Sequence, residues 1–428
     1  MLPALTRELS GLTGNQVFQR PETGSRPVRL GYLVSHPIQY QAPLLRRIAR
    51  EPGIDLHVLF GSDFSLRTYR DEGFGAEVAW DVPLLEGYSS EFLPVLRDRR
   101  TTSIASPMNL GIFDRLRGSE ASPGIDVLWV HGYSTVNALH GMMAARALDI
   151  PVLLRAESWL RDRPRSDAKL MAKQAFFRGL RRLVDAVLPI GTLNAAYWDA
   201  YLGEDVPQFL MPYAVDNTFF RSRSEAAGSG REALQRELNL TQGRQVILFA
   251  SKLQTRKRCA DLLKAYGCLC ASRRDSHFAP PYLLIVGDGE ERENLERAST
   301  GMEGVRFCGF RNQSELPRFF DLADVFVLPS QHEPWGLIVN EVMNAGRAVI
   351  LSDDVGCQPD LITDGVEGCV FPVGNVDCLT AALHRVLDEP GRAATMGDHG
   401  RHRIASWSFE QDVQALHAAL AYVTQARV

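Results

Sequence analysis

Short apolar runs alternate along most of the chain with longer segments in which apolar and polar residues are mixed. The runs have the length of β-strands, and several of the segments between them have the periodicity of helices. Because the runs contain few polar residues, both faces of each strand are expected to be buried. This pattern is typical of parallel sheets that are covered by helices on both sides.

The apolar runs form two groups. The first group comprises residues 28–35, 54–61, 126–132, 151–158 and 185–191. The second group comprises residues 245–251, 282–289, 305–310, 325–330, 348–353 and 368–373. Between the groups, residues 209–220 contain Pro212, and the next segment, "RSRSEAAGSGREA", is small and polar like a surface loop. We therefore place a domain boundary there.

The sequence predicts an α/β fold with two tandem Rossmann-like, doubly wound domains that face a cleft. A chain of 428 residues is long enough for two such domains. We expect a poorly ordered extension, a first domain, a second domain and a C-terminal helix that packs back on the first domain: residues 1–26, 27–212, 213–405 and 406–428. Ligands of such sheets bind at the carboxyl ends of the strands, so the cleft is the expected ligand site.

Composition narrows the class of protein. Apolar residues make up 45% and charged residues 23% of the chain, and the net charge is −4, so no bulk attraction to nucleic acid is expected. The N-terminal segment is not typical of a secretory signal, and no apolar run approaches the ~18 residues that span a bilayer. The seven cysteines include no CxxC pair, so free thiols in a reducing cytosol are expected rather than zinc or disulfides.

Charged residues follow several strands of the second group. Lys252 and Lys257 come after the run 245–251, where two ammonium groups suit a diphosphate or a merely solvated basic loop. Gly287 belongs to a GxG turn, which alone is weak evidence for phosphate binding. Glu333 stands just before a predicted helix and Glu341 about five residues into it, which separates them by about 8 Å along the helix axis. That span suits two ends of one polar ligand with an anion at the helix N-terminus between them.

Residues 213–405 resemble the donor-binding half of family 4 glycosyltransferases with the GT-B fold. The segments that carry the resemblance are "PYAVD", "FASKLQTRKRCADLLKAY", "LLIVGDG", "VRFCGF", "ADVFVLPSQHEPWGLIVNEVMNAGRAVILSDDVGCQPDLITDGVEG" and "VFPVGN". The fifth segment contains the E-x7-E pattern of the family.

The resemblance implies a role for each matching residue. It implies that Glu333 contacts the donor sugar, that Glu341 holds the ribose hydroxyls, and that Lys252 and Lys257 neutralise the diphosphate. Lys252 stands where an arginine is commoner, which removes a bidentate contact. The backbone amides of Gly336 and Leu337 would face the phosphates, and residues 307–313, with Phe310, would lie near the base.

The first domain resembles the family more loosely. His131 ends the run 126–132 and matches an active-site histidine, either as a donor-sugar contact or as a satisfied strand-end residue. "SHPIQY" stands where many relatives have two glycines, so His36 and Gln39 become acceptor-side candidates. Arg155 and Glu157 end another strand and are either acceptor-side residues or a plain ion pair.

The resemblance as a whole implies a retaining hexosyltransferase. Its donor would be a nucleoside diphosphate-sugar, with uridine as the expected base and guanosine as the alternative. Its acceptor would be a hydroxyl of a glycan, a glycolipid or a small molecule. We expect no cofactor and no metal, since cations and a helix N-terminus stand where the departing diphosphate needs neutralising. The alternatives are a sugar-nucleotide epimerase on the same scaffold and a non-catalytic subunit that binds nucleotide sugars.

A basic segment leaves the cellular setting open. Residues 166–184 have helical periodicity and carry Lys169, Lys173, Arg178, Arg181 and Arg182 on one face, with Phe176 and Phe177 nearby. This face is either solvated or in peripheral contact with an anionic membrane. We expect a cytoplasmic protein, either free or at the inner face of the membrane.

Overall fold

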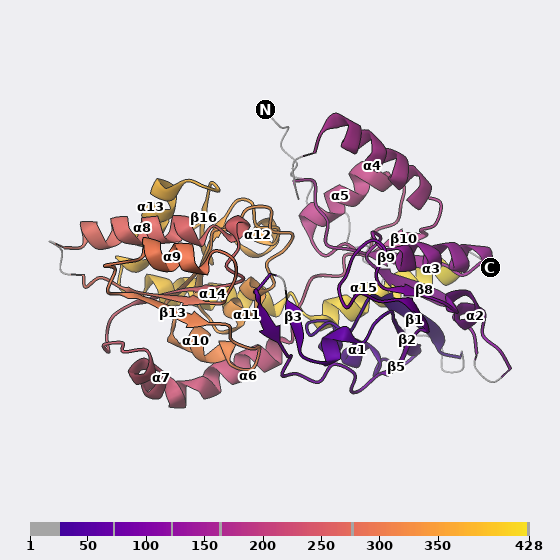
Figure 1. Ribbon diagram of the computed structural model, residues 1–428, viewed down its shortest axis with the longest axis horizontal. Coiled ribbons are helices and arrows are strands. Elements are labelled where there is room, and N and C mark those ends of the chain that lie inside the picture. Colours follow the sequence, from indigo (N-terminus) through magenta and orange to yellow (C-terminus); the bar gives the residue numbers. More distant parts are fainter. Residues whose placement is uncertain (1–25, 72, 121–122, 162–164, 275–277, 426–428) are drawn as a thin grey trace.

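A computed structural model describes residues 26–71, 73–120, 123–161, 165–274 and 278–425. The predicted N-terminal extension, except Arg26, lies outside the described residues. Two sheets of six strands each lie side by side, each with helices on its faces (Figure 1). All strand pairs within both sheets are parallel, so the two-domain α/β fold expected from the apolar runs is confirmed.

The first sheet has the strand order β10-β9-β8-β1-β2-β5. Its strands are β1 (Val28–Val34), β2 (Ile54–Phe60), β5 (Ser89–Phe92), β8 (Val127–His131), β9 (Val152–Arg155) and β10 (Ala186–Val187). The helices of this part of the chain are α1 (Ala42–Ile48), α2 (Ile112–Arg117), α3 (Val136–Ala147), α4 (Asp167–Leu180) and α5 (Thr192–Leu202).

Two short hairpins accompany the first sheet, and the apolar pattern did not predict them. They pair β3 (Tyr69–Asp71) with β4 (Ala76–Val78) and β6 (Val95–Arg97) with β7 (Met108–Asn109). Their strands are only two or three residues long, so they carry too few apolar residues for a strand signal.

The second sheet has the strand order β13-β12-β11-β14-β15-β16. Its strands are β11 (Val246–Ala250), β12 (Tyr282–Val286), β13 (Val305–Gly309), β14 (Val325–Leu328), β15 (Ala348–Ser352) and β16 (Gly368–Phe371). The helices are α6 (Asn217–Ala227), α7 (Arg231–Glu237), α8 (Cys259–Ser272), α9 (Arg292–Ala298), α10 (Leu316–Leu322), α11 (Ile338–Asn344), α12 (Gln358–Leu361), α13 (Val376–Leu387) and α14 (Arg392–Ala405).

Successive residues of each central strand belong to cores on opposite faces of the sheet. In β11, Leu248 packs in one core, whereas Ile247 and Phe249 pack in the other. In the first sheet, Leu33 and Tyr32 are divided in the same way. Both faces therefore need apolar side chains, which explains why the strands are unbroken apolar runs.

The last helix, α15 (Phe409–Gln425), belongs to the core of the first sheet. Val413, Leu416, Leu420 and Val423 recur at helical spacing, and all four are buried with Leu30 and other residues of that sheet. The helix lies along the first domain in Figure 1, after α14 has packed on the second. The chain therefore crosses between the domains twice, before α6 and between α14 and α15.

All seven cysteines are free, and four of them are buried: Cys259, Cys308, Cys357 and Cys369. Within the described ranges, no group of three or more His, Cys, Asp or Glu side chains is arranged to hold a metal ion. The same part of the chain contains no helix that is long and apolar enough to cross a membrane.

Candidate active site

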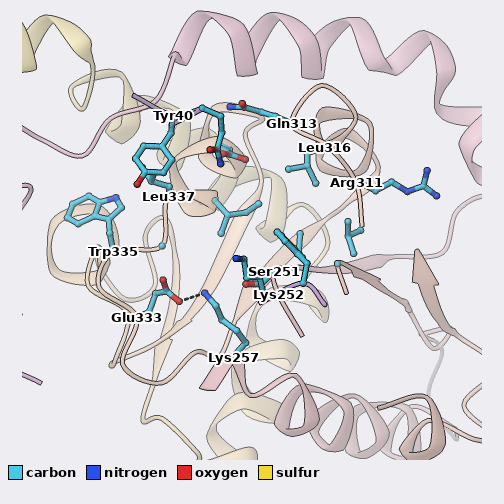
Figure 2. Close-up of a pocket in the computed structure, with 18 of the residues that line it drawn as sticks. Tyr40, Ser251, Lys252, Lys257, Arg311, Gln313, Leu316, Glu333, Trp335 and Leu337 are labelled. Atoms are coloured by element: carbon cyan, nitrogen blue, oxygen red, sulfur yellow. Dashed lines mark hydrogen bonds and ion pairs between the residues drawn. The ribbon is translucent and has the colours of Figure 1, made fainter. Parts of the chain in front are cut away.

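A cavity of about 430 Å³ lies between the two domains, beside the carboxyl ends of strands from both sheets (Figure 2). Most of the residues singled out from the sequence line it: Gln39, Glu157, Lys252, Lys257, Gly287, Phe310, Glu333, Gly336, Leu337 and Glu341. His36, His131 and Arg155 are not part of this lining. The two ends of the cavity differ in character, and we describe them in turn.

Glu333 lies on the loop after β14, and its backbone is fixed by a bridge to Val355. Its carboxylate pairs with Lys257 and with Arg256, whose Nη1 is 3.2 Å from Oε2. Burial alone would raise the pKa of Glu333, but the charges of Lys257 and Arg256 outweigh it, and the pKa lies below its usual value. Glu333 is therefore an ionised carboxylate that is paired through Oε2.

Lys257 ends a short 3₁₀ turn, Thr255–Lys257, that follows β11. Its side chain is buried, and Figure 2 shows its ammonium pointing at Glu333 across the floor of the cavity. Burial lowers the pKa of Lys257 from its usual value, and the charge of Glu333 opposes this effect. The pair holds a cation in place beneath the cavity.

Lys252 forms an ion pair with the first domain. Its Nζ lies 2.7 and 2.9 Å from the two carboxylate oxygens of Asp71, at the end of β3. The same ammonium lies 4.7 Å from the ring centre of Phe74, which makes an edge-on contact with Phe310 at 4.8 Å. Lys252 is thus partnered by a residue of the first domain across the cleft.

Glu341 lies in the first turn of α11 and has no such partner. Its side chain lines the cavity, and its Oε2 is buried without a hydrogen bond among the described residues. Burial raises the pKa of Glu341 from its usual value to about 8. An unsatisfied buried carboxyl is costly unless a ligand completes it, so this group marks a ligand contact.

The backbone at the start of α11 is also open to a ligand. Gly336 has a φ of 93°, which a glycine adopts without strain. The N–H groups of Gly336 and Leu337 donate no hydrogen bond within the described part of the chain, and both residues line the cavity. At Gly287, by contrast, a Cβ would lie 1.9 Å from the carbonyl oxygen of Ser251, so glycine is required there for close backbone packing.

Glu157 joins the cavity from the end of β9. Its Oε1 accepts hydrogen bonds from the hydroxyl of Tyr40, at 3.2 Å, and from that of Tyr213. The Nε2 atom of His131 lies 3.7 Å from the same oxygen and 2.9 Å from the amide nitrogen of Gln41. His131 therefore stands behind Glu157 rather than in the cavity wall.

His36 and Arg155 have other surroundings. The ring of His36 lies 4.4 Å from that of Phe64, and burial lowers the pKa of His36 to about 4. Arg155 is buried and donates to the backbone carbonyls of Met211 and Pro212 at 3.1 and 2.8 Å. Arg155 thus supports the crossing between the domains.

Several cavity residues were missed from the sequence. Arg256 stands between the two lysines in "KLQTRKR", so its charge was visible, but its contact with Glu333 was not. Tyr40, Tyr213 and Trp335 form an aromatic wall at one end of the cavity, and single aromatic residues carry no motif. Phe74 and Trp80 come from the first hairpin and the loop after it.

The basic helix α4 projects with α5 from the side of the first domain (Figure 1). Phe177 is 1% exposed and packs against the ring of Tyr201, so its side chain is not available for contact with a membrane. Phe176 and Met171 are exposed. The ammonium of Lys173 lies 4.2 Å from the ring centre of Tyr201, so this lysine is turned toward the protein.

Solved structures identify the fold as GT-B. A sucrose-phosphate synthase from Thermosynechococcus elongatus superposes with a TM-score of 0.65 at 18% identity, covering 93% of this chain and 100% of the other. The Anabaena protein HepE in complex with UDP superposes with a TM-score of 0.68 at 15% identity, covering 92% and 100%. At such low identity these likenesses establish the fold alone.

Residues 230–403 match the family described as "Glycosyl transferases group 1". The matched segment lies in the second domain and includes both glutamates and both lysines of the cavity. The family resemblance expected from the sequence is confirmed at this level.

Curated relatives of the same class are more similar in sequence. A GDP-mannose-dependent monoacylated alpha-(1-6)-phosphatidylinositol monomannoside mannosyltransferase from Corynebacterium glutamicum is 31% identical over 209 residues, 47% of this chain and 52% of that protein. A D-inositol 3-phosphate glycosyltransferase from Nocardiopsis dassonvillei is 26% identical over 325 residues, 71% of this chain and 72% of that protein. The chain thus spans about half the length of the first relative and more of the second.

Proposed function

We propose that the protein is a retaining, metal-independent glycosyltransferase that uses a nucleoside diphosphate-sugar. One observation supports this most directly: Glu341, whose Oε2 is buried without a hydrogen-bond partner among the described residues, shares a cavity with the cationic side chains of Lys252, Arg256 and Lys257. A ligand with hydroxyl groups at one point and a compact negative charge at another would pair the hydroxyls with Glu341 and the charge with the cationic side chains. A nucleoside diphosphate has this combination.

In the proposed complex each group has one task. The vicinal ribose hydroxyls donate to Glu341, and the diphosphate lies against Lys252, Lys257 and the free N–H groups of Gly336 and Leu337. The donor sugar then lies near Glu333, on the side of the cavity where Figure 2 places Trp335 and Tyr40. The base lies toward Arg311, Gln313 and Leu316, on the opposite side.

The chemistry follows from where charge develops. Cleavage of the sugar–phosphate bond leaves additional negative charge on the departing diphosphate. Lys257 and Arg256 are already held in place by Glu333, so they need no reorganisation as that charge forms. We propose that these cations replace a metal ion. The acceptor hydroxyl attacks on the face from which the diphosphate leaves, its proton passes to a β-phosphate oxygen, and the anomeric configuration is retained.

The base of the donor is proposed to be uracil, with guanine as the alternative. HepE binds UDP in one solved structure, and the C. glutamicum relative is described as GDP-mannose-dependent. Neither a sugar-nucleotide epimerase nor a non-catalytic binding subunit is favoured, because the family match and the related enzymes are transferases.

Donor binding and turnover test the proposal. Thermal unfolding is recorded with a panel of UDP- and GDP-sugars, because a ligand that binds only the folded state raises the melting temperature. One donor is expected to stabilise the protein and, without any acceptor, to release its nucleoside diphosphate slowly. Glu341→Gln should lose the stabilisation, whereas Glu86→Gln, at an exposed position outside the cavity, serves as the matched control.

Two outcomes contradict the proposal. If no sugar nucleotide shifts the unfolding transition, the cavity is not a donor site. If EDTA abolishes the activity and Mn²⁺ restores it, the cations do not replace a metal.

We also propose a cytoplasmic location and contact of α4 with an anionic bilayer. Vesicle flotation at low and high salt tests that contact.

A further inference from the structure

The charges around the cavity are divided between the two domains. Every cationic side chain that lines it comes from the second domain: Lys252, Arg256, Lys257 and Arg311. The first domain contributes Gln39, Tyr40, Phe74, Trp80 and Glu157, so Glu157 is its one charged residue among the described lining residues. The proposed donor carries its negative charge toward the second domain. The acceptor substrate, which would bind on the side of the first domain, therefore faces the carboxylate of Glu157.

Glu157 is held in one orientation by phenol groups. Tyr40 and Tyr213 both donate to Oε1, and their rings are edge-on at 5.5 Å. Burial raises the pKa of both tyrosines well above the usual value, so both phenols remain donors. Burial alone would raise the pKa of Glu157, but contacts with His131 and the two phenols outweigh it. The carboxylate is thus ionised and cannot rotate freely.

Only one of the two carboxylate oxygens is used. Oε2 of Glu157 has no hydrogen-bond partner within the described ranges, and 32% of the side chain is exposed where it lines the cavity. Beside it stands the wall of Tyr40, Tyr213 and Trp335, with the last two rings 6.2 Å apart. An oriented acceptor atom next to aromatic faces is suited to a ring that carries hydroxyl groups.

We propose that Oε2 of Glu157 accepts a hydrogen bond from the acceptor substrate, and that the part of the acceptor bound there is an uncharged polyol ring rather than a phosphorylated one. The proposal rests on the function proposed above and adds the chemical class of the acceptor. A phosphate at this position would stand against a fixed carboxylate with no lining cation from the same domain, which is unfavourable at short range. Glu157 is a positioning residue, since the proton of the attacking hydroxyl still passes to the donor phosphate.

The experiment compares neutral and phosphorylated acceptors. Release of nucleoside diphosphate from the preferred donor is measured with methyl α-D-glucoside, methyl α-D-mannoside and myo-inositol, and with a monophosphate ester of each. Neutral probes are expected to stimulate release, with kcat/KM about tenfold or more above that of the matching ester. Stimulation by the esters alone, or by neither class, overturns the proposal.

Variants separate positioning from structural support. Glu157→Gln is expected to raise the acceptor KM about tenfold and to reduce the discrimination against phosphate esters, because a bond to a charged acceptor atom is lost. The dissociation constant for the nucleoside diphosphate should stay unchanged. An unchanged acceptor KM with a lowered melting temperature would mean that Glu157 only supports the fold.

Two controls make the results specific. Tyr213→Phe, which removes one of the donors that orient Glu157, should raise the acceptor KM in the same direction. Glu86→Gln should change none of these values. If the wild-type protein binds no nucleoside diphosphate and turns over no donor, the proposed function itself has failed, and that result is distinct from an acceptor of the wrong class.

Discussion

At the scale of single residues, the two glutamates of the E-x7-E pattern show how surroundings set the chemistry of a carboxyl group. Both line the same cavity, where Glu333 is buried and Glu341 is half-buried with its Oε2 out of contact with solvent. Lys257 and Arg256 keep Glu333 ionised, whereas Glu341 has no cation beside it, and its pKa rises to about 8. In the proposed complex Glu333 can accept a sugar hydroxyl as it stands, whereas Glu341 must lose its proton before it accepts two ribose hydroxyls.

Nucleotide binding is therefore expected to depend on pH through Glu341. Below a pKa of about 8 most molecules carry the protonated carboxyl, so binding that requires the carboxylate must release a proton. The affinity for UDP or GDP should rise with pH up to about 8, by at most tenfold per unit, and then level off. Isothermal titration calorimetry in buffers of different ionisation enthalpy measures both the affinity and the proton release.

The control for this experiment is Glu341→Gln, whose side chain cannot ionise. This variant should bind the nucleotide weakly, and its affinity should not rise with pH above neutral pH. The 2′-deoxynucleoside diphosphate is a second control, because it removes one of the hydroxyls that the carboxylate accepts. Proton release that persists in the glutamine variant would assign the pH dependence to another group.

At the scale of elements, the first hairpin connects the domains across the mouth of the site. Asp71 of β3 pairs with Lys252, and Phe74 meets Phe310. Just after β4, the carbonyl of Ala79 accepts a hydrogen bond from the amide of Asn312 at 2.6 Å. In the proposed complex the hairpin would compete with the diphosphate for Lys252, while it helps to enclose the end of the cavity near Phe310.

Replacing Asp71 by Asn is expected to strengthen binding of the nucleoside diphosphate several-fold. The substitution removes a carboxylate that neutralises Lys252 and keeps the shape of the side chain. Only partial strengthening is expected, because an ion pair that is partly exposed contributes about 0–1 kcal/mol. Equilibrium binding at low salt measures the effect, which should shrink as salt screens the charges.

Asp63→Asn provides the comparison for this variant. Its carboxylate pairs with Arg67 on the surface and lies outside the cavity lining, so the affinity should not change. Weaker binding by Asp71→Asn would show instead that Asp71 orients Lys252 toward the phosphates.

At the scale of the whole molecule, one buried arginine links both crossings between the domains. Arg155 donates to the carbonyls of Met211 and Pro212 in the first crossing, and its guanidinium lies 3.5 Å from Asp412 of α15 after the second. Burial raises the pKa of Asp412 to about 7, and the charge of Arg155 opposes this. Replacing this arginine should therefore lower the stability of the whole two-domain chain.

Arg155→Met is expected to lower the free energy of unfolding by about 3 kcal/mol or more, because it leaves Asp412 without its ion-pair partner and two backbone carbonyls without their donor. The folded pKa of Asp412 is above its unfolded value, so ionisation of this group reduces stability as pH rises through about 7. Arg155→Met should accordingly lose more of the free energy of unfolding above pH 7 than at about pH 5, where the carboxyl of Asp412 is protonated.

Urea unfolding at the two pH values measures this difference. The double variant Arg155→Met with Asp412→Asn should recover part of the loss at the higher pH, since no buried charge is then left unpaired. A loss of the same size at both pH values would mean that the backbone carbonyls, and not Asp412, account for the role of Arg155.

The sequence by itself determined most strands of the two sheets and several of the charged residues that line the cavity. A strand buried on both faces must be apolar at every position, so the runs around Leu248 and Leu33 could be identified without a structure. Glu333 and Glu341, and likewise Lys252 and Lys257, are close along the chain, and local geometry places each pair near one strand end.

Only the tertiary structure decided which partners these groups have. Lys252 meets Asp71 across 181 positions of sequence, and Glu157 meets Tyr40 across 117. Such contacts exist because two independently formed sheets are set against each other by the crossings at Arg155 and α15. No local pattern encodes that arrangement, because the free energy that maintains it comes from packing between segments that are far apart in the chain.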